Sequence, residues 1–134
     1  MQKLLCDGLN ESARIIHENN KANGFWDGER NVGELLMLVT SELGEAMEAH
    51  RKDRFADKSL IDAALEEGYS WKDSEFSFKS YFESLVKDTF EDEIADAVIR
   101  LLDLCSGLGI DLEWHIRNKV AYNQTREKLH GKKY

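Results

Sequence analysis

Along most of this chain apolar residues recur every three or four positions, with polar residues between them, which is the pattern of an amphipathic helix. The pattern predicts four main helices, over residues 2–20, 31–52, 88–106 and 111–128. Asn31, with Glu34 three residues later, and Asp111 provide capping oxygens at two of the helix starts. Gly107 ends the third helix, whereas Gly8 is expected inside the first. Because the sequence contains no proline, we predict an all-α fold, a bundle of four to five helices.

Between the second and third helices, residues 53–87 follow the helical pattern less closely. A short helix is predicted over residues 60–67, and aromatic side chains are concentrated after it. Phe78 and Phe82 have helical spacing, whereas Phe76 and Phe78 alternate as in a strand, so both alternatives stay open. We interpret the segment 53–87 as an irregular or partly helical insertion. It either forms an apolar patch of its own or acts as a lid or a subunit contact.

Two acidic pairs stand out in the predicted helices, Glu42 with Glu45 and Glu93 with Asp96. Each pair has the spacing i, i+3, so its carboxylates share one helix face with Cβ atoms roughly 5–6 Å apart. A helical projection places both pairs at the border between the apolar stripe and solvent. Four carboxylates brought together would repel one another unless a cation neutralised them. All-oxygen donors favour Mg²⁺, or Mn²⁺, over zinc. The alternative is a solvated helix face without metal.

The same projection assigns the residues that face the core. In the second helix, the apolar stripe is predicted to comprise Val32, Leu35, Leu36, Val39, Leu43, Ala46 and Met47. In the third helix, Arg100 and Asp103 lie along the same border as the acidic pair. We expect Arg100 to form an intrahelical ion pair with Asp96, and the alternative is a contact with a phosphate.

Two further groups of residues indicate possible contacts with a ligand. Phe25 and Trp26 directly precede the second helix, where they either cap the core or stack on a flat ring. In the fourth helix, Lys119, Asn123 and Arg126 border a thin apolar stripe. A cation, an amide and a guanidinium on one edge suit phosphate oxygens and sugar or base groups. Cations are also common in the last turns of helices for purely electrostatic reasons.

Length and composition narrow the class of protein. A chain of 134 residues is typical of one domain, here 1–134. The net charge of −8 argues against binding to a nucleic acid polymer, although a divalent metal would still permit a nucleotide. Cys6 and Cys105 are expected to be reduced packing residues. The sequence has no apolar run of membrane-spanning length and no signal-peptide pattern, so we expect no membrane association and a cytoplasmic location.

Three motifs follow one another along the predicted helices. They are Ser41-Glu-Leu-Gly-Glu-Ala46, Glu93-Ile-Ala-Asp96 and Lys119-x-x-x-Asn123-x-x-Arg126. In this order, and with a basic fourth helix, they resemble the MazG-like nucleotide pyrophosphohydrolases of the all-α NTP pyrophosphatase superfamily. The resemblance covers residues 31–52 and 88–128.

The resemblance implies a MazG-like helical bundle assembled as a homodimer or homotetramer, with Mg²⁺ held by the four acids. It implies cleavage of a nucleoside triphosphate between the α and β phosphates, giving the monophosphate and pyrophosphate. The polar edge of the fourth helix would then contact the triphosphate or the nucleoside. Glu45 would orient or deprotonate the attacking water, and Phe25 or Trp26 would stack on the base.

A second class of function fits the same residues. The chain would then be a helical nucleotide-sensing or protein-interaction module that keeps the fold and the acids without turnover. A ferritin-like di-iron bundle is disfavoured, because that site needs Glu-x-x-His pairs and only Glu127-x-x-His130 matches.

Overall fold

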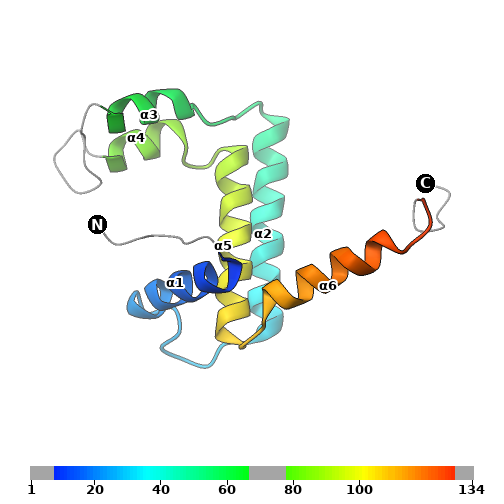
Figure 1. The fold of residues 1–134 in the computed structure, drawn as a ribbon. Helices are drawn as coiled ribbons and strands as arrows, with labels where there is room; N and C mark the ends of the chain where they lie inside the picture. The colour runs from blue at the N-terminus through cyan, green and yellow to red at the C-terminus, as the bar shows by residue number, and fades with distance from the viewer. Residues whose placement is uncertain (1–7, 67–77, 129–134) are drawn as a thin grey trace. The chain divides into compact units, whose positions relative to one another are not determined.

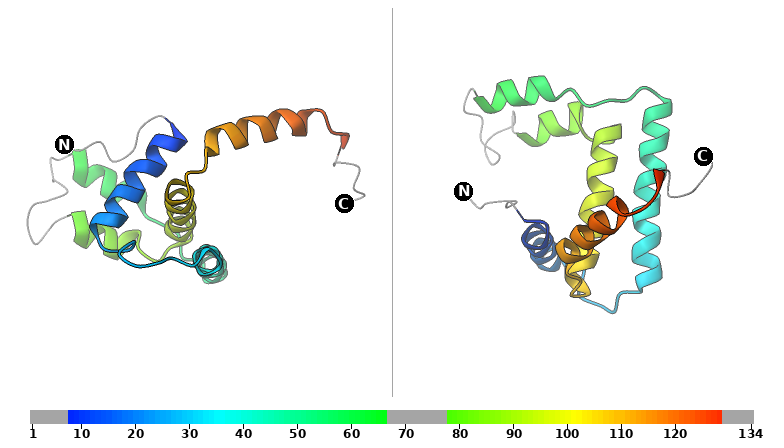
Figure 2. Two further views of the ribbon diagram at one scale, coloured as in Figure 1. Left: turned by 90° about the horizontal axis from the view of Figure 1, so that it is seen from below. Right: turned by 45° about the vertical axis from the view of Figure 1, so that its right-hand side comes forward.

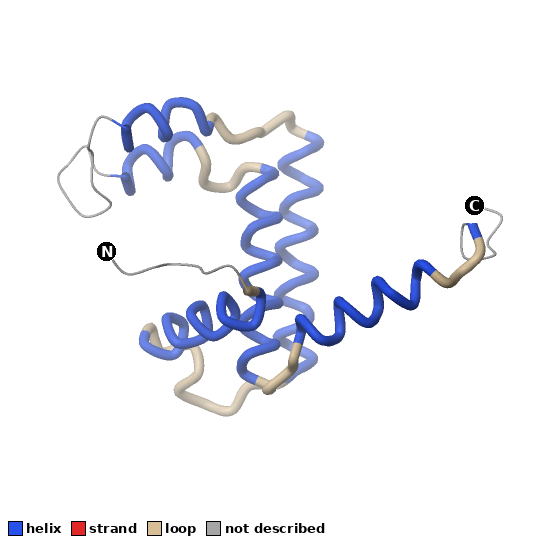
Figure 3. The backbone as a smooth tube through the Cα atoms, viewed as in Figure 1, coloured by secondary structure: helices blue, strands red, loops and turns tan. Residues whose placement is uncertain are grey.

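The computed structural model describes residues 8–66 and 78–128, and every regular element in these ranges is a helix (Figures 1 and 3). The all-α prediction is therefore confirmed for these ranges. The helices are α1 (Leu9–Ala22), α2 (Val32–Arg51), α3 (Lys58–Glu66), α4 (Phe78–Leu85), α5 (Phe90–Gly107) and α6 (Leu112–Gln124). None of them is both long and apolar enough to cross a lipid bilayer. The chain divides into two compact units, Asn31–Arg100 and Met1–Arg30 with Leu101–Tyr134, and α5 continues from one into the other.

In the Asn31–Arg100 unit, α2 and the first part of α5 lie side by side (Figures 1 and 2). The predicted start of α2 is confirmed, because the Asn31 side chain accepts a hydrogen bond from the Glu34 amide at 3.0 Å. At the start of α5, the buried Thr89 hydroxyl donates to the Val86 carbonyl at 2.6 Å and accepts from the Asp92 amide at 3.4 Å. These caps set where α2 and α5 begin, and therefore where their acidic residues lie along each helix.

The buried face of α2 differs from the predicted apolar stripe. Its buried residues are Val39, Glu42, Ala46 and Ala49. Glu42 therefore lies within the buried face and not at its border. Leu36, Leu43 and Met47, which the pattern placed in the stripe, are exposed. The prediction was wrong here because apolar residues cover a wide arc of α2, and periodicity does not say which side of a wide arc meets the neighbouring helix.

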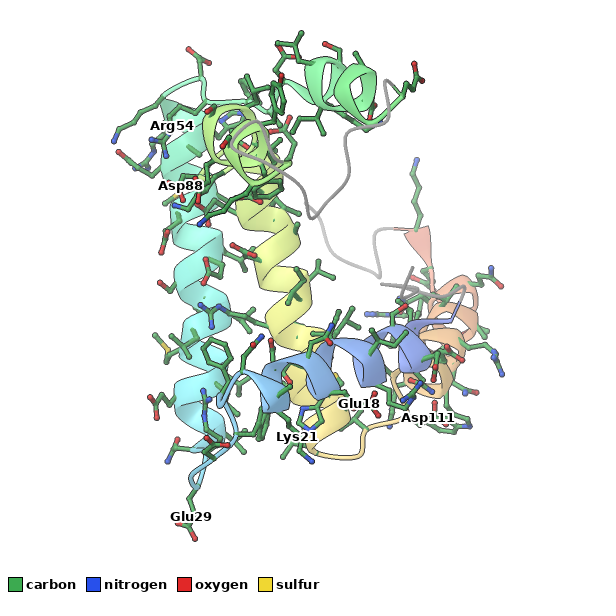
Figure 4. All side chains as sticks on the ribbon, turned by 90° about the vertical axis from the view of Figure 1, so that its left-hand side faces the viewer. Glu18, Lys21, Glu29, Arg54, Asp88 and Asp111 are labelled. Carbon is green, nitrogen blue, oxygen red and sulfur yellow. The ribbon has the colours of Figure 1, made fainter. Side chains whose placement is uncertain are left out.

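The two ends of the 53–87 insertion are joined to each other by hydrogen bonds. The Arg54 guanidinium donates to the Asp88 carbonyl at 2.7 Å (both are labelled in Figure 4), and the Phe90 amide donates to the Arg54 carbonyl at 2.9 Å. One turn further in, the Asp57 amide donates to the Leu85 carbonyl at 3.0 Å. The chain therefore enters and leaves the insertion at one place, next to the ends of α2 and α5.

Within the insertion, α3 confirms the predicted short helix, and α4 decides between the two alternatives for the aromatic stretch. Phe78 and Phe82 lie in α4, so the helical spacing describes the structure there. The two helices lie side by side (Figures 1 and 2). Phe76, on which the strand alternative depended, lies among residues 67–77, outside the described residues.

In the other unit, α1 begins after Gly8, which was expected inside the helix. That prediction was wrong, because Gly8 is the N-cap residue with extended backbone, φ −108° and ψ 143°. A Cβ at Gly8 would lie 2.7 Å from Glu113 Oε1, the oxygen that accepts a hydrogen bond from the Asn10 amide at 3.0 Å. The Asn10 side chain also donates to Asp111, the N-cap residue of α6, at 2.7 Å. The starts of α1 and α6 are thus tied together.

The second part of α5 carries Asp103, a buried carboxylate with several partners in this unit. Trp26 Nε1 donates to its two oxygens at 3.0 and 3.1 Å, and the Asn20 amide donates at 2.8 Å. His17 Nδ1 lies 2.7 Å from Asp103 Oδ1, and its ring makes an edge contact with the Trp26 indole. Asp103 therefore joins α1 and the loop after it to α5.

The α6 helix starts at its predicted cap but ends at Gln124, earlier than predicted.

Candidate metal centre

Three carboxylates from two helices meet in the Asn31–Arg100 unit. They belong to Glu42 and Glu45 on α2 and to Glu93 in the first turn of α5. One oxygen of each lies within 4.8 Å of the others. Glu42 and Glu93 are buried, whereas Glu45 is exposed. These three residues are called the acidic cluster below. They confirm that acids from the two predicted pairs come together.

Burial and mutual repulsion determine the protonation of this cluster. Burial raises the pKa of Glu93 from 4.5 to about 7, with further contributions from the Glu45 charge and from the hydrogen bond and charge of Glu42. Near neutral pH the Glu93 carboxyl is therefore partly protonated, which lowers the repulsion between the three side chains. A divalent cation would remove the need for that proton, because it supplies positive charge in the same place.

Asp96, the fourth predicted ligand, is not a member of the close triad among the described residues. It lies one turn after Glu93 on α5 and is half-buried. Burial raises the pKa of Asp96, and the charges of Asp92, Glu42 and Glu45 raise it further. Its carboxylate is therefore part of the same electrostatic environment, and its role as a ligand stays a prediction.

Arg100 lies on the same face of α5 and contacts the cluster directly. Its Nε–H donates to Glu42 Oε1 at 2.5 Å. The expected intrahelical pair with Asp96 is thus replaced by a pair that joins α5 to α2. The expectation was wrong because Glu42 is buried, and a buried carboxylate needs a counter-charge more than a half-exposed one does. The arginine is close enough to Asp96 to lower its pKa in part.

The exposed member of the cluster has its own local partner, which sequence reasoning missed. The Ser41 hydroxyl donates to Glu45 Oε1 at 3.4 Å. The signal was present in the sequence, since Ser41 and Glu45 are spaced i, i+4 on one helix. This long hydrogen bond reaches one oxygen of the exposed Glu45 side chain.

The two aromatic residues before α2 differ in their surroundings, and both lie in the other unit. Trp26 is partly buried, bonded to Asp103 and covered on one side by the Arg30 guanidinium, 5.6 Å from the ring centroid. These contacts agree with the alternative in which the residue caps a core. Phe25 is 58% exposed. Stacking on a base by either residue stays a prediction.

The predicted substrate residues also lie in that unit: Lys119 and Asn123 are in α6, and Arg126 follows two residues after its end. Lys119 Nζ lies 5.0 Å from the ring centroid of Tyr122, and the Arg126 guanidinium carbon lies 5.9 Å from it. Asn123 Oδ1 is buried and has no hydrogen-bond partner in the part of the chain that is described. Sequence reasoning noted Tyr122 alongside this edge but assigned no role to it, although it lies three residues after Lys119 and four residues before Arg126. A role in binding substrate stays a prediction for these residues.

The acidic cluster suits a hard divalent cation, because all its donors are carboxylate oxygens and two of the three are buried. Comparisons of the chain with protein-family models, curated proteins and solved structures found no match. The chemistry of the site is therefore inferred from its geometry and from the motifs.

Proposed function

We propose that this chain is a Mg²⁺-dependent nucleoside triphosphate pyrophosphohydrolase, which cleaves a (d)NTP to the (d)NMP and pyrophosphate. The observation that carries the proposal is the acidic cluster, with three carboxylates from two helices within 4.8 Å and two of them buried. Such a cluster is unfavourable without a counter-charge, so it is not expected on a merely solvated helix face. The order of the motifs, which resembles that of the MazG-like enzymes, supports the choice of reaction.

The exposure of each carboxylate suggests its role. Mg²⁺ or Mn²⁺ bound here would neutralise the phosphate chain and favour ionisation of water. Glu42 and Glu93 are buried and held by their helices, which suits them to fix the position of an ion. Glu45 faces solvent with one oxygen held by Ser41. We therefore assign to Glu45 the acceptance of a proton from the attacking water.

The remaining predicted residues are proposed for binding the substrate. Lys119 and Arg126 carry the charge, and Asn123 the amide, that phosphate oxygens and a nucleoside require. Phe25 is exposed and is therefore the better suited of the two aromatic side chains to stack on a base, because Trp26 already has partners in its own unit. This assignment is supported by chemistry and by the resemblance.

A nucleotide panel tests the reaction. The purified protein is incubated with each common NTP and dNTP, with Mg²⁺ or with EDTA, and the products are separated by anion exchange. Monophosphate and pyrophosphate are expected from at least one nucleotide, and both should disappear with EDTA. Diphosphate with free phosphate would show that a different bond is cleaved.

Glu45→Gln identifies the catalytic acid, with Glu83→Gln as the matched control. Glu83 is an exposed residue of α4 paired only loosely with Lys79, at 3.8 Å. Glu45→Gln should lower kcat by about 10²- to 10⁴-fold, the range for loss of a general base, whereas Glu83→Gln should not change it. If the folded protein binds nucleotide and metal but turns over nothing in the panel, the nucleotide-sensing module becomes the better description.

We also propose that the chain forms a homodimer or homotetramer. On α2, the side chains of Leu36, Met37, Leu43 and Met47 are exposed, and Met37 is 65% exposed. An apolar surface of this kind is common where subunits meet and uncommon on a monomer. Light scattering coupled to size exclusion should give a mass of at least twice 15.4 kDa. A monomer at micromolar concentration would contradict the proposal.

A further inference from the structure

We infer that Arg100 is an exchangeable counter-ion of the acidic cluster: it pairs with Glu42 in the metal-free protein, leaves that carboxylate when a divalent cation binds, and then binds phosphate oxygens of the substrate. The inference rests on the proposed function, because the metal and the phosphate chain are those proposed above. It assigns to Arg100 a role that neither the motifs nor the resemblance assigns.

The contact between Arg100 and Glu42 is the first step of the argument. It is short, 2.5 Å, and joins a side chain that is 41% exposed to one that is 9% exposed. A buried carboxylate gains most from a nearby positive charge, because the surroundings screen that charge poorly. In the absence of metal, Arg100 therefore supplies part of the positive charge that the acidic cluster lacks.

The second step concerns the donors that Arg100 keeps free. A guanidinium has five N–H donors, and bidentate pairing with a carboxylate uses two of them side by side. Here a single Nε–H contacts Glu42. In the parts of the chain that are described, the two terminal nitrogens have no hydrogen-bond partner. The edge of the group that best fits a phosphate is therefore open beside the acidic cluster.

The third step decides which partner moves. A divalent cation at Glu42 would lie close to the guanidinium, and two positive charges on one carboxylate repel. Glu42 is held in the buried face of α2 between Val39 and Ala46. Arg100 reaches the cluster on a long, partly exposed side chain and can turn to solvent with little loss of packing. The arginine therefore yields Glu42 to the metal, and the incoming phosphates offer it a new anion at the same place.

A substitution that removes the charge tests both halves of the exchange. Arg100→Gln is compared with the wild type and with Arg51→Gln, a control with the same change in charge at an exposed residue near the end of α2. Isothermal titration with Mn²⁺ alone measures metal affinity. Titration of the Mn²⁺-loaded protein with inorganic pyrophosphate measures phosphate binding without turnover.

The exchange predicts changes of opposite sign. Arg100→Gln should bind Mn²⁺ about fivefold more tightly than the wild type, since a competing charge is gone. The same variant should bind pyrophosphate about tenfold more weakly, since a charged donor is lost. Arg51→Gln should change neither value. Equal or weaker Mn²⁺ binding in Arg100→Gln would show that Arg100 only orients Glu42, and unchanged pyrophosphate binding would show that it meets no phosphate. Either result overturns the inference.

A failure of the proposed function gives a different result. If the wild type itself binds no Mn²⁺, the proposed metal centre is overturned, and the inference about Arg100 is overturned with it. Should Arg100→Gln not fold, nitrogen NMR of the wild type gives an independent answer. The Nε–H signal of Arg100, assigned with Arg100→Lys, should move when Mg²⁺ is added and move again with pyrophosphate. A signal that stays in place on addition of saturating Mg²⁺ would overturn the exchange.

Discussion

The indole nitrogen of Trp26 donates to both oxygens of Asp103, at 3.0 and 3.1 Å, across 77 residues of sequence. Asp103 also accepts from Asn20 and contacts His17 Nδ1. One buried carboxylate thus joins three side chains of α1 and the following loop to α5. Because each donor loses its partner if the carboxylate is removed, we expect substitution of this residue to destabilise the protein.

Asp103→Asn should destabilise the protein by about 1–3 kcal/mol, the cost of leaving buried donors without an acceptor. The amide supplies one acceptor oxygen in place of two and turns an N–H₂ group toward other donors. Urea denaturation followed by Trp fluorescence measures the change. Asp62→Asn is the control, an exposed residue paired with Lys58 on α3, and it should change stability by no more than about 0.5 kcal/mol. Equal effects of the two substitutions would contradict the role given to Asp103.

Two helical glycines should respond to alanine with opposite signs. A Cβ at Gly107 would lie 2.5 Å from a carbon of the Trp26 ring, so Gly107→Ala should destabilise the protein by about 1–3 kcal/mol. At Gly44, in α2, a Cβ meets no atom of the described residues within 4 Å. Gly44→Ala should therefore stabilise the helix by roughly 0.5–1 kcal/mol. Thermal unfolding of both variants checks the pair, and a gain in stability for Gly107→Ala would show that the ring does not pack there.

The metal-free protein should lose stability as pH rises. Burial and the neighbouring carboxylates raise the pKa of Glu93 from 4.5 to about 7, so folding favours the protonated form. A group of this kind contributes fully below pH 4.5, and its contribution is lost as pH rises to about 7. The pKa of Asp96 is raised in the same direction, also mainly by burial. We expect a lower Tm at pH 7.5 than at pH 5.5 in EDTA.

Glu93→Gln separates this effect from general pH dependence. The neutral side chain cannot ionise, so the decline in Tm between these pH values should become smaller. The exposed Glu83→Gln should keep the decline of the wild type. A Tm that rises across this range in wild type but not in Glu93→Gln would contradict the raised pKa.

Mg²⁺ should stabilise the folded protein through the acidic cluster. A ligand at one hundred times its Kd adds about 2.7 kcal/mol to the free energy of unfolding. Glu42→Gln should abolish most of that gain, because it removes a buried carboxylate from the cluster. Glu48→Gln, an exposed change on the same helix, should keep it. Tm with and without Mg²⁺ measures the difference, and an equal gain in both variants would place the ion elsewhere.

Local chemistry predicted where α2 and α5 begin and end, and where α6 begins. The caps at Asn31 and Asp111 are both observed, since a capping oxygen depends only on residues a few positions away. The position of Gly8 was not predictable in this way. Its extended backbone accompanies a close approach to Glu113, more than one hundred residues along the chain, and no local pattern encodes that contact.

The acidic residues illustrate the same limit at the candidate site. Spacing predicted that Glu42 and Glu45 share a face with each other, and Glu93 with Asp96. It did not show which acids would be buried, because that depends on how α2 and α5 face each other. The pairing of Arg100 with Glu42 depends on the burial of Glu42, so it could not be predicted from spacing either. The sequence therefore predicted which residue types make up the site. It did not predict which carboxylates are buried or which of them pairs with Arg100.

The hydrogen bonds that join the two ends of the 53–87 insertion have a consequence for how this protein can change in evolution. Arg54 is hydrogen-bonded to both Asp88 and Phe90, so we expect residues added or removed beyond this point to leave α2 and α5 in place. Doubling the length of a flexible loop costs only about 0.6 kcal/mol when its ends are held together. We therefore expect that mutation can lengthen, shorten or replace this segment without displacing Glu42 or Glu93.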